Sequence, residues 1–351
     1  MAANKGDDDY VWKSFENVTR LARVDGTEVK VQKLDDKTEI QRMIGTGGHS
    51  GDWGYINRSS GWADAEAAMK FARRKVEDMD RVALLTGTAK RLLFRGRKVI
   101  GVELDDSSGG QLHAELVILA TGAWTGTLVD LRGRATATGQ VLAYVAITAA
   151  EQSRLGKMPV ILNISTGHFI IPPRNGLLKV ARHGYGYTNR RLIPHPHHRP
   201  DLSGDGRSET MEISTPPSEP SASGAIPGEG SDACRAALGE MIPSLAARPF
   251  SKTRICWYTD TPSGDFIVTY HPDFEGLFLA TGGSGHAFKF LPVIGEKVVD
   301  AIEGVLEEEL NELWRWREER IEGDWTTEDG SRGGRRGMVL GVEMGRTGSK
   351  L

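Results

Sequence analysis

The feature that most constrains the fold is a short apolar strand that runs into a glycine-rich turn and then into a helix. It occupies residues 276–304 (GLFLATGGSGHAFKFLPVIGEKVVDAIEG). The run FLATG has the apolar character of a buried strand, and the helix is expected after Pro292. The glycines leave the backbone N–H groups of the turn free to face an anion or another ligand. A second run, VILATGAW (117–124), has the same form and indicates a core strand of an α/β sheet.

The first half of the chain predicts a loop, a helix and then strands. The segment before residue 54 is polar and weakly periodic. Its glycine cluster GTGGHSGDWG (45–54) does not follow an apolar strand, so we interpret it as a loop and not as a dinucleotide cradle. Residues 63–79 combine strong helix formers with apolar residues at helical spacing. Three β-rich runs follow between residues 81 and 124, and a β-rich block extends from about residue 135 to 190.

The second half predicts a surface loop, further strands and helices, and a polar tail. Residues 197–230 are rich in Pro, Gly, Ser and charge, which is typical of a loop or linker. Residues 231–245 predict a short helix that begins at Ser231 or Asp232 as its cap. After three strands, residues 297–321 predict helical segments with acidic residues earlier and basic residues later, as the helix dipole favours.

Composition and charge narrow the function classes. A net charge of -3 without a long basic stripe makes nucleic acid an unexpected partner. No apolar run reaches the roughly eighteen residues of a membrane span, so no membrane association is predicted. The two cysteines, Cys234 and Cys256, do not form a disulfide framework, and no metal site is predicted. The final residues Ser349, Lys350 and Leu351 match the peroxisomal address S-K-L, which predicts a peroxisomal location and an import receptor as partner.

Three segments together resemble the sarcosine oxidase and fructosyl-amine oxidase (amadoriase) family of FAD-dependent amine oxidases, which includes saccharopine-oxidase-like proteins. They are GLLKVARHGYG (176–186), RICWYTDTPSGDFIVTYHP (254–272) and GGSGHAFKFLP (282–292), in the order seen in that family. The likeness extends from about Gly54 to Trp316, and the last segment is the most specific. The resemblance implies oxidation of a small-molecule amine with O2, which yields an imine and hydrogen peroxide.

The resemblance assigns roles to three residues beside the flavin. Cys256 occupies the position at which family members bind FAD covalently through a thioether, although a lone strand cysteine is more often an inert small hydrophobe. Lys179 matches the family lysine beside the flavin, where its charge would stabilise superoxide as oxygen takes its first electron. His183 keeps the family's Lys-x-x-x-His spacing. Residues four apart in a strand point to the same face, so Lys179 and His183 can line one site.

Further residues are expected at the cofactor and the substrate. Lys289 matches the family lysine that holds the substrate carboxylate over the flavin. Arg182 could pair with a second substrate carboxylate, a hypothesis from its charge alone. Lys90 corresponds by strand register to a backbone pair that family members use to bind adenine. The remaining predicted cofactor contacts lie in the glycine-rich turn and are Gly283, Ser284, Gly285, His286 and Phe288.

The resemblance also implies the fold, which is of class α/β with α+β mixed character. Family members begin with a βαβ unit that carries G-x-G-x-x-G, and this sequence shows no such unit before Gly54. We therefore expect a Rossmann-like FAD-binding domain that is incomplete at its N-terminus, beside an antiparallel-sheet domain for the substrate. The predicted divisions are a polar N-terminal segment (1–53), the FAD-binding domain (54–134 and 255–321), the substrate-binding domain (135–254, with the loop 197–230) and a flexible tail (322–351).

Two other functions stay open at this point. The absence of the phosphate cradle keeps open a catalytically silent homologue of a flavoenzyme, which could bind a protein partner instead of a substrate. A noncovalent enzyme similar to D-amino-acid oxidase is the third possibility, and the context of Cys256 disfavours it. The sequence does not choose between N-alkylated, glycated and saccharopine-like amino acids as substrates.

Overall fold

The computed structural model describes residues 1–351 except 106–109, 198–208, 219–223, 324 and 348–351. The predicted terminal address at residues 349–351 and parts of the predicted loop 197–230 therefore lie outside the described residues. Within the described chain, no helix is both long enough and apolar enough to cross a membrane. The helices are α1 (Asp9–Val24), α2 (Lys37–Ile44), α3 (Ala65–Met79), α4 (Ala149–Leu155), α6 (Gly228–Met241), α7 (Leu291–Glu303), α8 (Glu308–Trp314) and α9 (Leu340–Thr347), with short 3-10 turns η1 (Glu28–Lys30), η2 (Gly122–Thr127), η3 (Pro243–Leu245) and η4 (Ala287–Phe290).

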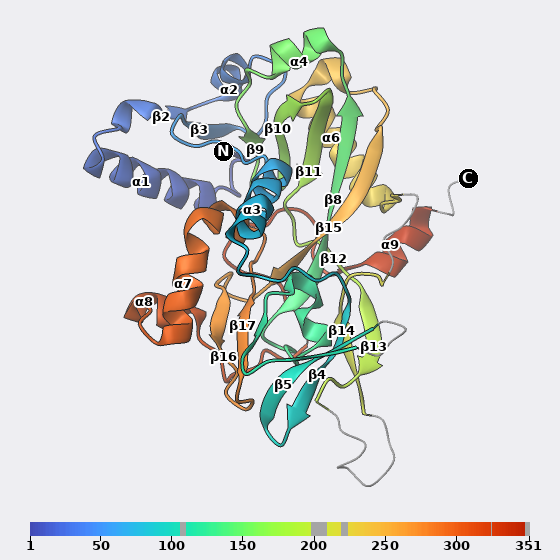
Figure 1. Cartoon of the computed structure of the whole chain (residues 1–351). Coiled ribbons are helices and arrows are strands. Elements are labelled where there is room, and N and C mark those ends of the chain that lie inside the picture. Colours follow the sequence, from blue (N-terminus) through green and yellow to red (C-terminus); the bar gives the residue numbers. More distant parts are fainter. Residues whose placement is uncertain (106–109, 198–208, 219–223, 324, 348–351) are drawn as a thin grey trace.

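A mostly antiparallel seven-stranded sheet forms the centre of the molecule (Figure 1). Its order is β18-β12-β8-β11-β10-β9, and β15 pairs with the other edge of β8. Its strands are β8 (Thr136–Ala146), β9 (Ile161–Leu162), β10 (His168–Arg174), β11 (Leu177–Arg182), β12 (Tyr187–Thr188), β15 (Lys252–Asp260) and β18 (Met338–Val339). The smaller sheets consist of β1 (Ala2–Ala3), β2 (Val31–Leu34) and β3 (Trp53–Asn57), of β4 (Ala89–Arg95), β5 (Lys98–Leu104) and β6 (Gln111–His113), of β7 (Val117–Leu119), β16 (Ile267–Tyr270) and β17 (Leu277–Thr281), and of β13 (Arg190–Pro194) and β14 (Thr210–Ser214).

One face of the large sheet is apolar and is covered by α6. Side chains alternate along a strand, so Val141 and Val145 of β8 lie on the same face as Val180 of β11, and all three are almost fully buried. They join Leu238 and Met241 of α6 in the largest core cluster. Burial of aliphatic side chains of this size stabilises the fold by about 1.5–3 kcal/mol each.

A buried ion pair also ties α6 to the sheet. The Arg182 guanidinium donates to both carboxylate oxygens of Glu229, at 2.5 and 2.9 Å, and Tyr187 donates its hydroxyl proton to the same carboxylate. The Arg182 side chain is only 5% exposed. Because a buried guanidinium without a partner is costly, this pair fixes how α6 lies on the sheet.

The two apolar runs that end in glycine turns form adjacent parallel strands. Leu277, Phe278 and Leu279 of β17 pair with residues 117–119 of β7, and β16 pairs with the other edge of β17. α7 and α8 pack on this sheet around the buried side chains Phe278 and Trp314. The predicted α/β fold class is therefore confirmed, with several antiparallel sheets beside the parallel pair.

The N-terminal segment differs from the predicted polar loop. It contains two helices and strands, and it contributes Ala3, Val11 and Trp53 to a small core with Ile164, which lies just after the large-sheet strand β9. Val11, Phe15, Val18 and Ala22 lie at helical spacing on one face of α1, and its acidic start is favourable at a helix N-terminus. The glycine cluster is a loop, as predicted, because Gly45 ends α2 in a left-handed conformation.

Two other local predictions were wrong. The run RVALLTG (81–87) forms no strand, and its Val82 and Leu85 side chains are 56% and 69% exposed. α6 begins at Gly228 after Pro227, not at Ser231 or Asp232. A short apolar run does not form a strand when no neighbouring strand is in position to pair with its backbone N–H and C=O groups.

The predicted flexible tail is packed against the body of the protein in its described part. β18 pairs in parallel with β12, and the side chains of Arg332 and Thr327 are buried. The boundary predicted at residue 255 also falls inside β15, which pairs with β8 along its whole length. The large sheet therefore includes strands from both predicted domains and from the tail.

We expect the Glu229→Gln variant to lose about 3 kcal/mol of its free energy of unfolding, since it leaves the buried Arg182 cation without a counter-charge. Urea denaturation measures this loss. The control is Glu66→Gln, which removes an exposed ion pair with Lys70 within α3 and should leave the unfolding midpoint nearly unchanged. Equal effects of the two variants would contradict the structural role of the buried pair.

Candidate active site

The face of the large sheet opposite α6 carries the reactive side chains. Lys179 of β11 pairs with Tyr144 of β8, and Cys256 of β15 pairs with Gln140 of β8. Directly paired residues share a face, and so do residues two apart on one strand. Lys179, Cys256 and the next residue but one along β15, Tyr258, therefore lie on the same side of the sheet.

Lys179 is a partly buried cation without a counter-charge. Burial lowers the pKa of its ammonium, Arg254 lowers it further, and Cys256 opposes both effects. Within the described residues Lys179 forms no ion pair, and its Nζ lies 5.5 Å from the centre of the Phe169 ring. In such surroundings the positive charge of the ammonium can stabilise a bound anion or negative charge that develops nearby.

The glycine-rich turn lies against this face of the sheet. The backbone N–H of Ser284 donates to Thr259 O at 2.9 Å, which fastens the turn to β15. Ser284 has a φ of 44°, an unusual left-handed conformation for a residue other than glycine. Gly285 has a φ of 71°, and a Cβ at this position would come within 2.5 Å of the Tyr258 ring. Glycine is therefore required where the turn meets β15.

A hydrogen-bonded cluster joins the turn to His183. Nδ1 of His183 lies 3.3 Å from the Tyr258 hydroxyl and 3.3 Å from Nη1 of Arg332. Nη2 of Arg332 donates to the Asp260 carboxylate at 2.6 Å and to the carbonyl oxygen of Ser284 at 2.8 Å. Arg332 thus connects the tail, β15, the turn and His183.

Burial governs the protonation of this cluster. It lowers the pKa of His183 to about 3, and the nearby cations Arg332 and Lys289 act in the same direction. Burial also raises the pKa of the Asp260 carboxyl, an effect that Arg332 opposes. His183 is consequently neutral at physiological pH.

The predicted turn residues lie together around this cluster. His286 is partly buried, its Nδ1 lies 3.0 Å from the carbonyl oxygen of Ser284, and its ring lies 5.2 Å from that of Phe266. Phe288 and Lys289 are exposed in η4, and Lys289 is close enough to His183 to lower its pKa. The turn and β11, 100 residues apart in the sequence, therefore build one site.

Two predicted residues do not join the site. Arg182 ends β11 on the same face as Val180, and Glu229 and Tyr187 hold it there. It is not available to a substrate carboxylate, and that hypothesis is corrected. Lys90 lies in the separate sheet of β4, β5 and β6 and forms an ion pair with Glu103 at 3.2 Å.

Sequence reasoning missed three residues of the cluster. Tyr258 could have been found, since it is two residues beyond Cys256 and must share its face. Asp260 could have been found in the same way, since it lies two residues beyond Tyr258. Arg332 gave no signal, because it lies in a polar, glycine-rich segment that is 149 residues from His183.

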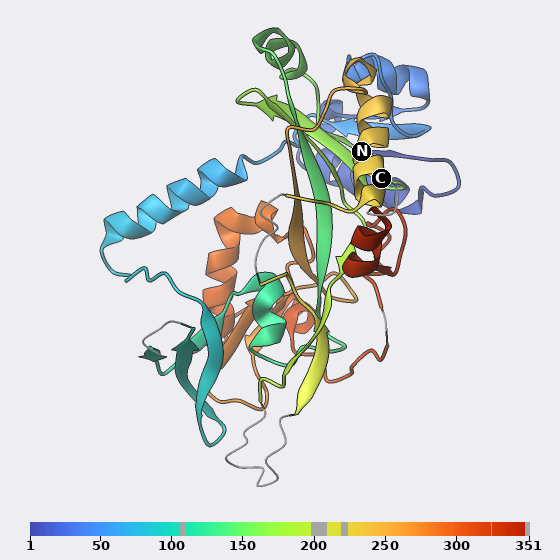
Figure 2. The ribbon, with the colours of Figure 1, turned by 90° about the vertical axis from the view of Figure 1, so that its right-hand side faces the viewer.

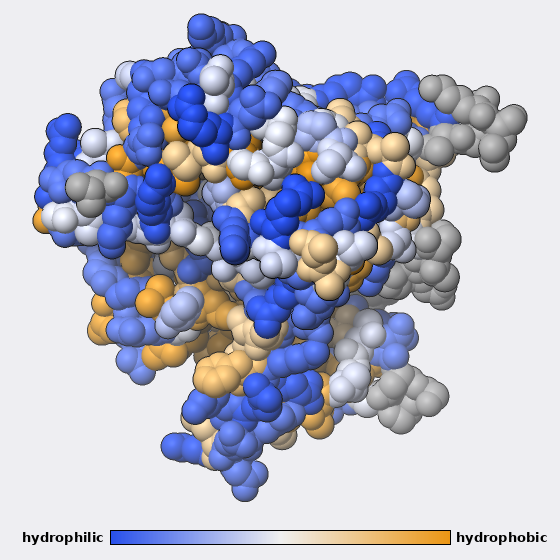
Figure 3. All heavy atoms as spheres, turned by 90° about the horizontal axis from the view of Figure 1, so that it is seen from above, coloured by the Kyte–Doolittle hydropathy of each residue, from blue (hydrophilic) through white to orange (hydrophobic). Residues whose placement is uncertain are grey.

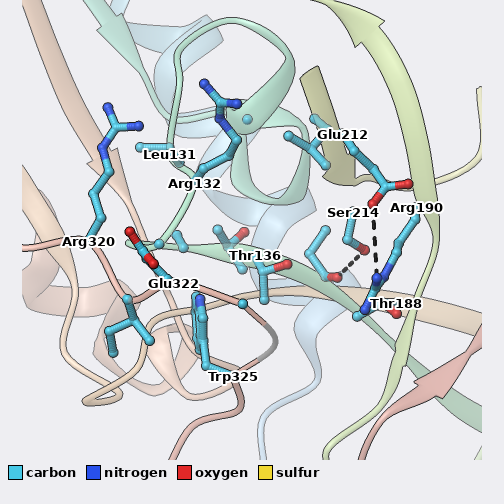
Figure 4. A pocket seen from close by; sticks show the side chains of 18 of the residues that line it. Leu131, Arg132, Thr136, Thr188, Arg190, Glu212, Ser214, Arg320, Glu322 and Trp325 are labelled. Atoms are coloured by element: carbon cyan, nitrogen blue, oxygen red, sulfur yellow. Dashed lines mark hydrogen bonds and ion pairs between the residues drawn. The ribbon is translucent and has the colours of Figure 1, made fainter. Parts of the chain in front are cut away.

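Two cavities adjoin each other near the cluster, and only the smaller one is lined by residues of the cluster. The larger, of about 570 Å³, is lined by polar and charged side chains that include Arg132, Arg320 and Glu322 (Figure 4). The smaller, of about 260 Å³, includes Asp260 and Arg332 in its lining. Both cavities share lining residues, which are Thr136, Thr188, Arg190 and Trp325.

An apolar surface is exposed beside the parallel strands. α3 stands away from the body of the molecule and buries none of its residues, although Met69 and Phe71 are apolar (Figure 2). α7 likewise leaves Val293 and Val299 about half exposed. β7 is the edge strand of its sheet, and its Ile118 is 44% exposed. The view from above shows hydrophobic residues gathered around a hollow of the surface (Figure 3).

A profile of the DAO family, described as FAD dependent oxidoreductase, matches residues 9–301. The chain belongs to this family. The family predicted from the segments around Lys179, Cys256 and Gly283 is thus confirmed, and the match begins well before Gly54, where the predicted likeness began.

Among curated relatives, amino acid oxidase imqH of Aspergillus flavus is 34% identical over 306 residues. L-saccharopine oxidase of Schizosaccharomyces pombe is 29% identical over 276 residues.

The likeness covers most of this chain and less of its relatives. Each alignment spans 75% of this chain, but only 62% of the Aspergillus flavus relative and 60% of the Schizosaccharomyces pombe relative. Among solved structures, the deglycating enzyme fructosamine oxidase (Amadoriase II) of Aspergillus fumigatus gives a TM-score of 0.74 at 30% identity, over 88% of this chain and 72% of that one. A modified fructosyl peptide oxidase of Aspergillus nidulans gives 0.79 at 27% identity, over 95% and 77%.

The residues on the reactive face fit the flavin end of FAD. The turn offers backbone without side chains at its closest approach to β15, where Gly285 meets Tyr258. The Cys256 thiol is free and partly exposed on the same face as the Lys179 cation. Cys234, by contrast, is buried in the α6 core, where burial raises the pKa of its thiol to about 12.

We expect Gly285→Ala to displace the Tyr258 ring and to lower the free energy of unfolding by about 1–3 kcal/mol, through left-handed strain and overpacking. Chemical denaturation and near-UV circular dichroism measure these effects. Gly295→Ala within α7 is the matched control, since a Cβ there meets nothing within 4 Å. Alanine favours a helix over glycine, so this control should be neutral or slightly stabilising. A harmless Gly285→Ala would refute the close contact.

Proposed function

We propose that this chain, with FAD bound, oxidises a C–N bond of a secondary amine or an amino acid, with O2 as electron acceptor and with an imine and hydrogen peroxide as products. The observation that carries the proposal is the partly buried Lys179 cation, which forms no ion pair within the described residues and lies on the same sheet face as Cys256. His183 contacts Tyr258 on that face, where the glycine-rich turn also meets the sheet. Family membership and the oxidase names of its relatives support the same chemistry.

We propose that Sγ of Cys256 holds the flavin covalently as a thioether. Bound FAD would supply hydride acceptance from the carbon next to the substrate nitrogen and electron transfer to oxygen. The chain's own groups orient the reactants and set the local charge. No protein nucleophile is needed for this reaction.

Lys179 and Lys289 have different proposed roles. Lys179 is partly buried, so its positive charge acts at short range and in a low dielectric, where it would favour reduction of oxygen to superoxide. Lys289 is exposed in η4 at the edge of the cluster and would bind a substrate carboxylate as a compact point charge. A carboxylate-bearing amine is the class of substrate that this pair of cations favours.

We propose that the protein acts in the peroxisome, through the S-K-L address at residues 349–351 and its import receptor. Release of hydrogen peroxide agrees with that compartment, because peroxisomes contain catalase.

Cys256→Ala is expected to abolish covalent flavin attachment. The wild-type protein should be yellow, and the colour should stay with the pellet after acid precipitation. In the variant the colour should move to the supernatant. The control Cys234→Ala changes a thiol in the α6 core and should keep the colour in the pellet. Absorbance near the flavin bands in both fractions is the measurement.

Each other outcome selects a different function. Wild-type colour found in the supernatant would favour a noncovalent enzyme similar to D-amino-acid oxidase. A colourless protein would favour the catalytically silent homologue. Covalent flavin retained in Cys256→Ala would refute the assigned anchor.

Lys179→Met should slow reoxidation of the reduced flavin by oxygen by roughly 10²–10³-fold, the loss typical of one preorganised electrostatic group. Reduction by substrate should change much less. Stopped-flow absorbance separates the two half-reactions. Lys252→Met is the control, because this exposed lysine also pairs with Tyr144 but lies at the rim of the sheet. A variant that slows reduction more than reoxidation would contradict the oxygen role.

A further inference from the structure

His183 is held on one ring nitrogen by a group that can only donate. Nη1 of Arg332 lies 3.3 Å from Nδ1, and a guanidinium has five N–H donors and no acceptor. Arg332 cannot turn away freely, because its other terminal nitrogen is bound to Asp260 and to the carbonyl oxygen of Ser284. If Nδ1 carried a proton, its N–H group would face the N–H donor of Arg332. The geometry therefore requires an unprotonated Nδ1 that accepts the hydrogen bond.

We propose that Arg332 is a positioning residue that holds His183 in the neutral form protonated on Nε2, so that this histidine serves the site as an N–H donor and not as a base. The Tyr258 hydroxyl, also 3.3 Å from Nδ1, is compatible with this state because a hydroxyl can donate or accept. The inference rests on the proposed function only for what the donor binds.

The charged groups around His183 act together to keep it neutral. Burial is the largest cause of the lowered pKa of His183; Arg332, His286 and Lys289 lower this pKa further, and Asp329 raises it. The nearest buried carboxylate, Asp260, is bound to Arg332 and Thr138 instead of to the imidazole. Among the charged groups on the turn, the tail and β15, the cations therefore have a larger effect on the protonation of His183 than the carboxylates.

The consequence concerns the class of ligand that this side of the site accepts. Nε2 of His183 has no hydrogen-bond partner within the described residues, and the ring is partly exposed. A neutral N–H donor beside the Lys289 cation suits a carboxylate or carbonyl oxygen. His183 cannot then remove a proton from an ammonium substrate, so the amine must reach the site in its neutral form or lose its proton elsewhere.

Two-bond proton–nitrogen spectra of the full-length protein labelled with 15N-histidine test the proposal, with His183→Gln to assign the signal. We expect His183 to show the Nε2–H pattern throughout about pH 5–8, the range in which an ordinary histidine titrates. An Nδ1–H pattern, or titration within that range, would overturn the proposal. The spectra need neither flavin nor turnover, so a colourless or inactive protein would defeat the proposed function without affecting this test.

Variants identify the cause of the tautomer. Arg332→Met combined with Asp260→Asn removes the donor without leaving a buried carboxylate unpaired. We expect the tautomer ratio of His183 to shift by about tenfold or more, the size of a lost hydrogen bond to a charged group. Arg332→Lys keeps an obligate donor and should retain the Nε2–H pattern, as should Tyr258→Phe. An unchanged ratio in the double variant would show that Arg332 does not set the tautomer.

Discussion

Side chains alternate between the two faces of the large sheet along β8, β11 and β15, and this alternation determines what each face contacts. β8, β11 and β15 are paired over many residues, so one common face of the three strands packs on α6 and the other carries Lys179, Cys256 and Tyr258. A shift of register by one residue would exchange the two faces and place Lys179 in the core. The same alternation separates neighbours in sequence: Arg182 stabilises the packing of α6, whereas His183 belongs to the site.

Short-range sequence patterns predicted those parts of the fold that the spacing of nearby residues specifies. The two glycine-ended strands, the helix at 65–79 and the common face of Lys179 and His183 could all be derived from spacing. The N-terminal helices were not predicted, and the apolar face of α1 gains its stability by packing near β9. The position of Arg332 depends on tertiary contacts alone, and the family resemblance did not extend to it.

The surface beside β7 is apolar, as the interior of a protein is. Parallel strands are normally covered on both faces, yet here the edge strand, α3 and α7 leave apolar side chains exposed. Apolar surface of this extent is found at sites where other structure packs. The glycine-rich turn and this uncovered layer thus belong to the same small sheet, since the turn follows β17 directly.

The contact of Arg332 with His183 has a consequence for how the protein folds. The two residues are 149 positions apart, and Arg332 and Asp260 are separated by 72. Contacts between such distant segments carry a larger loop-closure cost than local hairpins such as β10–β11. The ordered cluster therefore depends on the same docking of the tail that brings β18 beside β12 in the large sheet.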